Sequence, residues 1–303
     1  MDTLILDRTG YGAEEENWIC DQYGKPVMRL QDTTAYLALR REMQQILGKD
    51  PECLSAELLG CQAELKTGVH ASAKEVIEEL EYHSNIANLA LHNIDPNLRL
   101  ESVAYKNMDG IELVAADPSA PSYQRVLDWS QTANGRELLR KTAICSTQLC
   151  VSKGLENLNA QQKRQLLARC YGFLSDNYGV IQELNANSPR LGIIEELIIS
   201  VKKDNFDKLG LLAESGRDET FITRPNNMNE ADLIAWYMAH SGVLKAEDIK
   251  SKDAHGLLLK GKMITGTMDL GCFEHRWADA SPDRQNVIAN IYAMHHRMMD
   301  SCN

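Results

Sequence analysis

Two prolines stand close together near the middle of the chain, in the segment Asp117-Pro118-Ser119-Ala120-Pro121-Ser122. Proline lacks a backbone N–H and disfavours helical geometry in the residue before it, so no regular helix continues through this segment. The small polar residues around the prolines are typical of an exposed linker. We therefore expect the 303-residue chain to divide into a domain at 1–116, a linker at 117–122 and a second domain at 123–303.

The part before the linker mixes strand and helix signals. Strand-like runs flank turns at 22–25 and 107–110, and Asp109-Gly110 within the second turn is a strong hairpin signal. Apolar residues recur with the period of a helix over about 33–47, 52–66 and 71–92. The fold class that these patterns predict for 1–116 is α+β, a small mixed α/β domain with two β-hairpins.

The part after the linker has a helical pattern throughout. Polar residues that favour the start of a helix stand at Asn159, Ser188, Asn229 and Ser281. The periodicity predicts helices that include about 135–151, 160–174 and 282–300. We expect a larger all-helical domain here and a protein that is mostly helical.

The composition is that of an ordinary globular protein, with 44% hydrophobic and 25% charged residues. No apolar run approaches the ~20 residues that span a bilayer, and the first residues lack the features of a signal peptide. The eight cysteines include no Cys-x-x-Cys pair, which disfavours a zinc ribbon. We expect a soluble, cytoplasmic protein without a membrane partner, and no pattern in the sequence predicts a metal or a cofactor.

Charge is distributed unevenly along the chain, whose formal net charge is −11. Residues 1–123 carry 10 basic and 21 acidic side chains, and residues 171–303 carry 14 and 19. Residues 124–170 reverse the balance, with 8 basic and 3 acidic side chains. A local excess of cations can supply the phosphate contacts that dominate nucleic-acid binding, even in an acidic protein.

The basic segment is the strongest lead to a binding surface. In its two predicted helices the cations lie largely off the apolar stripes, so they face solvent or a partner. The candidate partner-binding residues are Arg125, Arg136, Arg140, Lys141, Lys153, Lys163, Arg164 and Arg169. The partner is an acidic protein surface or nucleic acid, and a homo-oligomer fits the first case. The same cations are also compatible with internal pairing to the acidic N-terminal part, because charged runs are usually solvated faces.

Four patterns with catalytic or ligand-binding potential have simpler structural interpretations. Residues 256–262 match a phosphate-binding loop up to its lysine, but Met263 replaces the expected Ser or Thr. Glu79 and His83 are spaced to meet on one helix face, where a buried core histidine is the favoured interpretation.

The other two patterns are adjacent pairs. His295 and His296 point about 100° apart on a helix, as do Glu195 and Glu196, so neither pair readily shares a ligand. The sequence therefore specifies no enzyme. It predicts a non-catalytic intracellular binding or assembly protein. The alternative is a metal- or carboxylate-dependent hydrolase or transferase that uses buried Glu and His residues.

Overall fold

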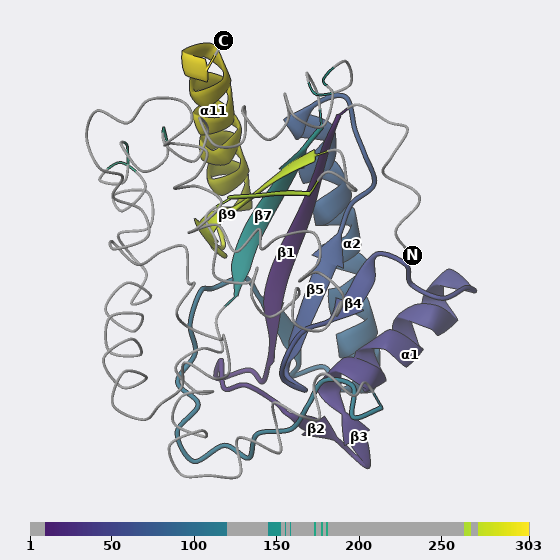
Figure 1. The fold of residues 1–303 in the computed structure, drawn as a ribbon. Helices are drawn as coiled ribbons and strands as arrows, with labels where there is room; N and C mark the ends of the chain where they lie inside the picture. The colour runs from purple at the N-terminus through teal and green to yellow at the C-terminus, as the bar shows by residue number, and fades with distance from the viewer. Residues whose placement is uncertain are drawn as a thin grey trace.

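The protein is described by a computed structural model over residues 10–119, 145–152, 264–267 and 272–302, with the single residues 155, 158, 173, 177 and 180. Its centre is a seven-stranded sheet in which all the paired strands run antiparallel (Figure 1). The strands of this sheet are β1 (Tyr11–Cys20), β4 (Leu54–Ala56), β5 (Gln62–Lys66), β6 (Arg99–Glu101), β7 (Ser146–Val151), β8 (Ile264–Thr267) and β9 (Cys272–Asp279).

The strand order is β4-β5-β1-β7-β9-β8, and β6 pairs with the last residues of β1. A separate two-stranded sheet joins β2 (Arg29–Leu30) to β3 (Thr33–Thr34). β1 is therefore the central strand, since it pairs with β5 on one side and with β7 and β6 on the other. Every group that β1 presents lies in the middle of the sheet.

The residues of β1 alternate between two unlike faces of the sheet. Tyr11, Ala13 and Ile19 belong to the main apolar core. Trp18 and Cys20 face the other way, into a smaller apolar cluster at the far end of the strand. Successive side chains of a strand point to opposite faces, so the even-numbered glutamates of β1 share a face with Trp18.

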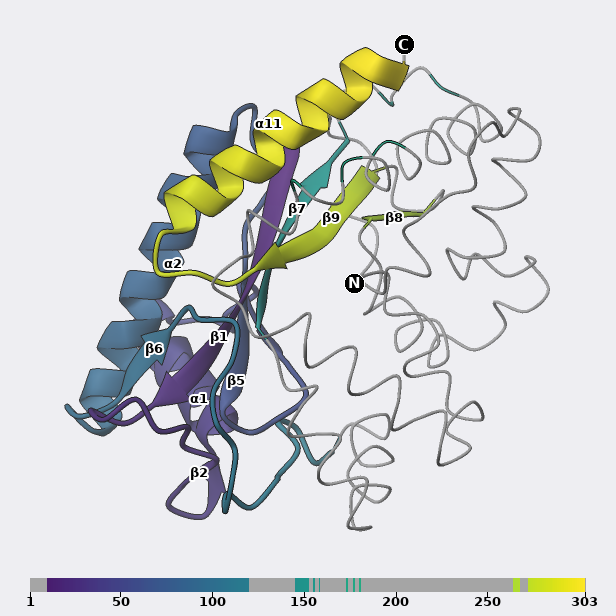
Figure 2. The same cartoon turned by 90° about the vertical axis from the view of Figure 1, so that its left-hand side faces the viewer.

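Three helices of the described residues cover one face of the sheet. They are α1 (Ala35–Leu47), α2 (Ala73–Ile94) and α11 (Arg284–Cys302), and Figure 2 shows α2 and α11 on the same side of β1 and β7. A capping box of Ser72 and Glu75 begins α2, and Gly48, in the left-handed region at φ 66°, ends α1. We call this side the helix face and the opposite side the open face.

The main core lies between the sheet and the helix face. Strand residues such as Leu65 and Leu149 pack there against Leu39 of α1, Leu80 of α2 and Ile291 of α11, and all five are fully buried. Full burial of one such side chain contributes about 1.5–3 kcal/mol. Burial of the helix face thus fixes which side of each strand is left for the open face.

The structure corrects the helix that the sequence predicts at 52–66. This segment folds into β4 and β5, which pair with Leu54 opposite Leu65. The spacing of Leu54, Leu58 and Leu65 resembles a helical stripe, but pairing with β1 buries the segment as strands instead. Tertiary pairing overrides local propensity in such cases.

The predicted all-helical second part is also wrong, and the residues that the structure describes are not mostly helical. β7, β8 and β9 all follow residue 123 and belong to the same sheet as β1. The helix predicted at 135–151 ends as β7, because its apolar residues Leu149 and Val151 are buried beside β1. The predicted division at 117–122 stays a prediction.

The two predicted hairpins differ in outcome. At the first, Val27 N–H donates to Ile19 O across the turn at 21–25, although only Cys20 and Pro26 form a bridge. At the second, Gly110 adopts φ 70° in a turn, but the residues on either side do not pair with each other as strands. None of the helices that the structure describes is long and apolar enough to cross a membrane.

Candidate metal centre

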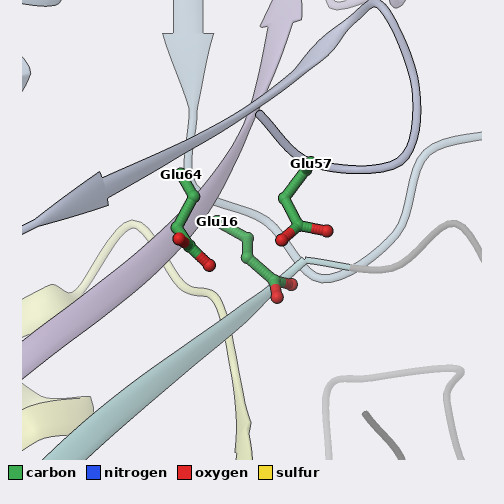
Figure 3. Close-up of side chains that lie close together, drawn as sticks. All are labelled: Glu16, Glu57 and Glu64. Carbon is green, nitrogen blue, oxygen red and sulfur yellow. The ribbon is translucent and has the colours of Figure 1, made fainter. Parts of the chain in front are cut away.

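Three glutamates meet on the open face of the sheet, as Figure 3 shows. Glu16 comes from β1, Glu64 from β5, and Glu57 from the residue that follows β4. Each side chain offers one carboxylate oxygen within 4.8 Å of the other two. Their exposures are only 6%, 6% and 8%, so three acidic groups are concentrated away from bulk water. We call them the carboxylate cluster.

Strand pairing places the cluster. Glu16 lies directly opposite Glu64 in the β1–β5 register, and directly opposed residues of an antiparallel pair project from the same face. Like charges in this position destabilise a sheet. Strand register therefore brings the two carboxylates together at a cost to the stability of the sheet.

Glu16 and Glu64 are held by specific donors. The backbone N–H of Ser146 donates to Glu16 Oε2 at 2.8 Å, and Gln148 Nε2 donates to Glu16 Oε1 at 3.0 Å. Ser55 Oγ donates to Glu64 Oε1 at 2.5 Å. These bonds orient the carboxylates before any ligand arrives.

Lys66 is the ammonium group beside the cluster. Its Nζ lies 2.9 Å from Glu64 and 3.4 Å from Glu14. Burial lowers the pKa of Lys66, but the charges of Glu64 and Glu14 outweigh burial, so this pKa is raised above its ordinary value. Lys66 therefore stays charged at neutral pH and balances part of the acidic face.

The acidic groups of the open face also raise the pKa values of two buried thiols, Cys145 and Cys150. Burial is the main cause that raises the pKa of Cys145 well above its usual range, and Glu16 adds to it. For Cys150, the hydrogen bond with Cys272 comes first and burial second, with Glu274 and Glu14 adding further increases in its pKa. Both thiols stay protonated at neutral pH, so they are not nucleophiles here.

A close backbone approach fixes the loop that carries Glu57. Gly60 N–H donates to Val114 O at 2.7 Å, and Gly60 O accepts from Tyr36 N–H at 2.9 Å. A Cβ at Gly60 would lie 2.7 Å from the carbonyl oxygen of Met28, which only glycine avoids. The turn between β4 and β5 is thus held at Gly60 by two backbone hydrogen bonds.

The donor set fits a hard divalent cation. Mg²⁺, Mn²⁺ and Ca²⁺ prefer carboxylate and carbonyl oxygens, and oxygens on opposite sides of one such ion lie about 4.2–5 Å apart. The three oxygens lie within 4.8 Å of one another, so they are close enough to bind one such ion. Gln148 Oε1 is buried and accepts no hydrogen bond within the described ranges, while Nε2 of the same amide donates to Glu16. In the same ranges, no other three His, Cys, Asp or Glu residues come this close.

Two pairs that the sequence offers as candidate sites, Glu79 with His83 and His295 with His296, have structural contacts instead. His83 is buried in α2, which confirms its predicted place in the core, and its Nε2 lies 3.7 Å from Glu79 Oε1. The prediction of a hydrogen-bonded core histidine holds only in part, because its Nδ1 has no hydrogen-bond partner within the described residues. Glu79 meanwhile binds His70 at 2.5 Å. His295 is buried and His296 is exposed, as their divergence on the helix predicts, and His295 Nδ1 lies 2.8 Å from His275 Nε2.

The remaining candidates lie outside the described residues. They are the loop at 256–262, Glu195, Glu196 and all eight proposed partner-binding cations, namely Arg125, Arg136, Arg140, Lys141, Lys153, Lys163, Arg164 and Arg169. The carboxylate cluster, in contrast, is absent from the sequence-based predictions. Its signal was the run Glu14-Glu15-Glu16, followed by two further glutamates in a segment interpreted as a helix.

Known proteins share the fold but not the sequence. No protein family and no curated protein matches the chain. It is similar to the glutamate–cysteine ligase of Francisella tularensis in complex with AMP, with a TM-score of 0.52 and 13% identity. It is also similar to the bifunctional glutathione synthetase of Pasteurella multocida, with a TM-score of 0.46 and 12% identity.

Coverage is unequal in both comparisons. The match with the glutamate–cysteine ligase covers 96% of this chain and 66% of that one, and the match with the glutathione synthetase covers 91% and 36%. This chain thus spans less than two thirds of either. The predicted non-catalytic binding or assembly protein is contradicted by the first comparison, because the glutamate–cysteine ligase that is similar in fold is named as an enzyme. The alternative prediction, a hydrolase or transferase, is not the class that this name gives either.

Proposed function

We propose that this chain is an ATP-dependent ligase that joins a carboxylate to an amine, and that Glu16, Glu57 and Glu64 hold its divalent cation. The observation that carries the proposal is the carboxylate cluster, built from three segments of the sheet with its oxygens within 4.8 Å of one another. The fold supports it, since the similar glutamate–cysteine ligase was solved with AMP. A bound cation would neutralise and orient the phosphates of the nucleotide.

The chain's own residues supply orientation. Ser146, Gln148 and Ser55 hold the carboxylates by the bonds described above, so the cluster needs little rearrangement to receive a cation. Lys66 keeps a positive charge at the edge of the cluster, between Glu64 and Glu14. The main core behind the sheet makes this frame rigid, which is what precise positioning of substrates requires.

The chemistry of an ATP-dependent ligase determines which activity should be measured. In a ligase of this kind the substrate carboxylate attacks a phosphorus of ATP and expels ADP or pyrophosphate, which leaves an acyl phosphate or an acyl adenylate. The amine then attacks the acyl carbon, loses a proton and displaces phosphate or AMP, which gives the amide. Nucleotide turnover should therefore depend on the presence of both a carboxylic acid and an amine. The purified chain is incubated with ATP, Mg²⁺ and pools of amino acids, and release of ADP or AMP is followed.

Two variants make the test specific. Glu16→Gln keeps the size of the side chain but removes a charge from the cluster, and we expect at least about a 100-fold loss of turnover, since even outer-shell changes cost 10–100-fold. Glu78→Gln makes the same change on the exposed side of α2 and should leave turnover unaltered. A wild-type protein that binds neither Mn²⁺ nor ATP, or a fully active Glu16→Gln, would exclude the proposal.

A further inference from the structure

Glu15 stands between the two glutamates of the open face, but it points to the opposite side. Its side chain is completely buried on the helix face, near the main core. A carboxylate in such surroundings is very unfavourable unless it is paired and hydrogen-bonded. The feature that keeps Glu15 there also decides where Glu14 and Glu16 point, because the three residues are consecutive in one strand.

Arg284 supplies that pairing. Its Nε donates to Glu15 Oε1 at 2.7 Å and its Nη2 donates to Glu15 Oε2 at 2.5 Å, so the two groups meet in a bidentate geometry. Asn17 Nδ2 adds a bond to Glu15 Oε2 at 3.3 Å, and Ser102 Oγ donates to Asn17 Oδ1 at 2.6 Å. Each oxygen of Glu15 thus has a donor.

Arg284 itself has a fixed place. It is the first residue of α11, and only 14% of its side chain is exposed. Asp283 accepts from Asn286 N–H at 3.1 Å, and Gln285 donates to Glu81 of α2 at 3.2 Å. The first turn of α11 is therefore anchored to a second helix, and the guanidinium group cannot easily follow Glu15 if β1 moves.

The ladders that β1 forms with β5 and β7 are regular at Glu15, and the nearest irregularity lies one strand away, between β7 and β9. Glu15 lies opposite Thr147 of β7, and the pairing of β7 with β9 shifts register between Thr147 and Leu149. Irregular ladders of this kind re-aim side chains. If an unpaired Glu15 turns toward the polar open face, the strand must rotate and Glu16 is displaced from the cluster.

We infer that Arg284 is a positioning residue of the carboxylate cluster: by holding Glu15 on the helix face, it keeps Glu14 and Glu16 on the open face. This inference rests on the proposed function for its meaning as part of a metal centre. Arg284 touches no substrate or cation and acts only through Glu15.

Arg284→Met tests the inference through the sign of its effect on Mn²⁺ affinity. An unpaired Glu15 adds negative charge behind the site, so electrostatics alone makes Mn²⁺ bind as tightly or more tightly. A purely structural role leaves the affinity of the folded protein unchanged. Displacement of Glu16 instead weakens binding, by about 10–100-fold if the loss resembles that for other outer-shell partners.

Glu15→Met/Arg284→Met is the rescue variant. Apolar side chains of similar volume often replace a buried ion pair without loss of stability, and a methionine at position 15 stays on the helix face unaided. We expect the double variant to recover Mn²⁺ affinity to within about threefold of the wild type. Should Arg284→Met fail to fold, Arg284→Lys takes its place. Lysine cannot form the bidentate pair but keeps the positive charge, so we expect Mn²⁺ affinity to fall by a smaller factor.

Hydrogen exchange of the β1 amides provides a readout that needs no metal. In Arg284→Met we expect the amides of residues 14–16 to exchange at least about tenfold faster than in the wild type, and the double variant to restore slow exchange. Unchanged exchange in a folded Arg284→Met, or Mn²⁺ affinity equal to or tighter than that of the wild type, overturns the inference. Absence of Mn²⁺ binding by the wild type overturns the proposed function instead, and hydrogen exchange still decides the role of Arg284.

Discussion

The two faces of the central sheet differ in what their buried residues do. On the helix face, Leu65 and Leu149 are buried among apolar side chains, and the one buried carboxylate of β1 there is neutralised by Arg284. On the open face, Glu16 and Glu64 are almost as deeply buried but stand opposite each other. One face is organised for stability, and the other concentrates like charge at a cost in stability, as functional sites commonly do.

The largest expected effect is a difference in stability between a variant on the helix face, in β5, and a variant on the open face, in the neighbouring strand β1. Leu65→Ala should destabilise the protein by about 2–5 kcal/mol, because it opens a cavity in the core. Glu16→Gln should change the free energy of unfolding by less than about 1 kcal/mol, because glutamine keeps an acceptor for Ser146 N–H. Denaturant unfolding of both variants measures the difference. Equal losses of stability would break the comparison.

A smaller effect is expected from acid on the helix face. Burial lowers the pKa of His295 to about 4, and burial together with His295 lowers the pKa of His275 well below its ordinary value. Both histidines therefore bind fewer protons when folded than when unfolded. Stability contributed by the neutral pair is present above about pH 6.5 and is lost as the pH falls toward 4.

The pH dependence of thermal unfolding tests this expectation. His295 alone should account for about 2 kcal/mol of destabilisation between pH 8 and pH 5, by linkage from its pKa shift. The variant His295→Asn should show a shallower pH dependence than the wild type over this range. The exposed His92 is the control position, and His92→Asn should keep the wild-type slope. Parallel slopes for all three proteins would exclude a buried neutral pair.

The smallest expected effect is a loss of stability from a change at the start of α2, on the helix face. Ser72 accepts from Glu75 N–H at 3.3 Å in the capping box of α2, and Ser72→Ala should cost about 1 kcal/mol of stability. Because α2 lies on the helix face, Mn²⁺ affinity should stay at the wild-type value. Isothermal titration with Mn²⁺, beside a melting curve, checks both halves of this expectation, and a weakened affinity would show that the faces are not separable.

Local signals in the sequence were enough to predict the three helices that the structure describes. The pattern at 33–47 became α1, that at 71–92 became α2, and that at 282–300 became α11, each within about two residues. Caps and a 3.6-residue period are properties of contiguous residues, so they can be interpreted without a partner. They located the helices of the helix face.

The carboxylate cluster depends instead on long-range strand pairing. Glu16 and Glu64 are 48 positions apart in the chain and meet only because β1 pairs with β5. Interpreting 52–66 as a helix placed Glu57 and Glu64 on the wrong element, and so left Glu16 without a visible partner. The sheet was missed for the same reason, because β7 pairs directly with β1, and β9 joins the sheet only through β7.

A crystal grown with Mn²⁺ and a non-hydrolysable ATP analogue tests the central claim most directly, through the anomalous signal of manganese. We predict a peak bounded by the carboxylates of Glu16, Glu57 and Glu64, with oxygen distances of about 2.0–2.6 Å. Clear density for all three side chains with no manganese among them, or with an ammonium or guanidinium group of the chain filling that position, would contradict the account.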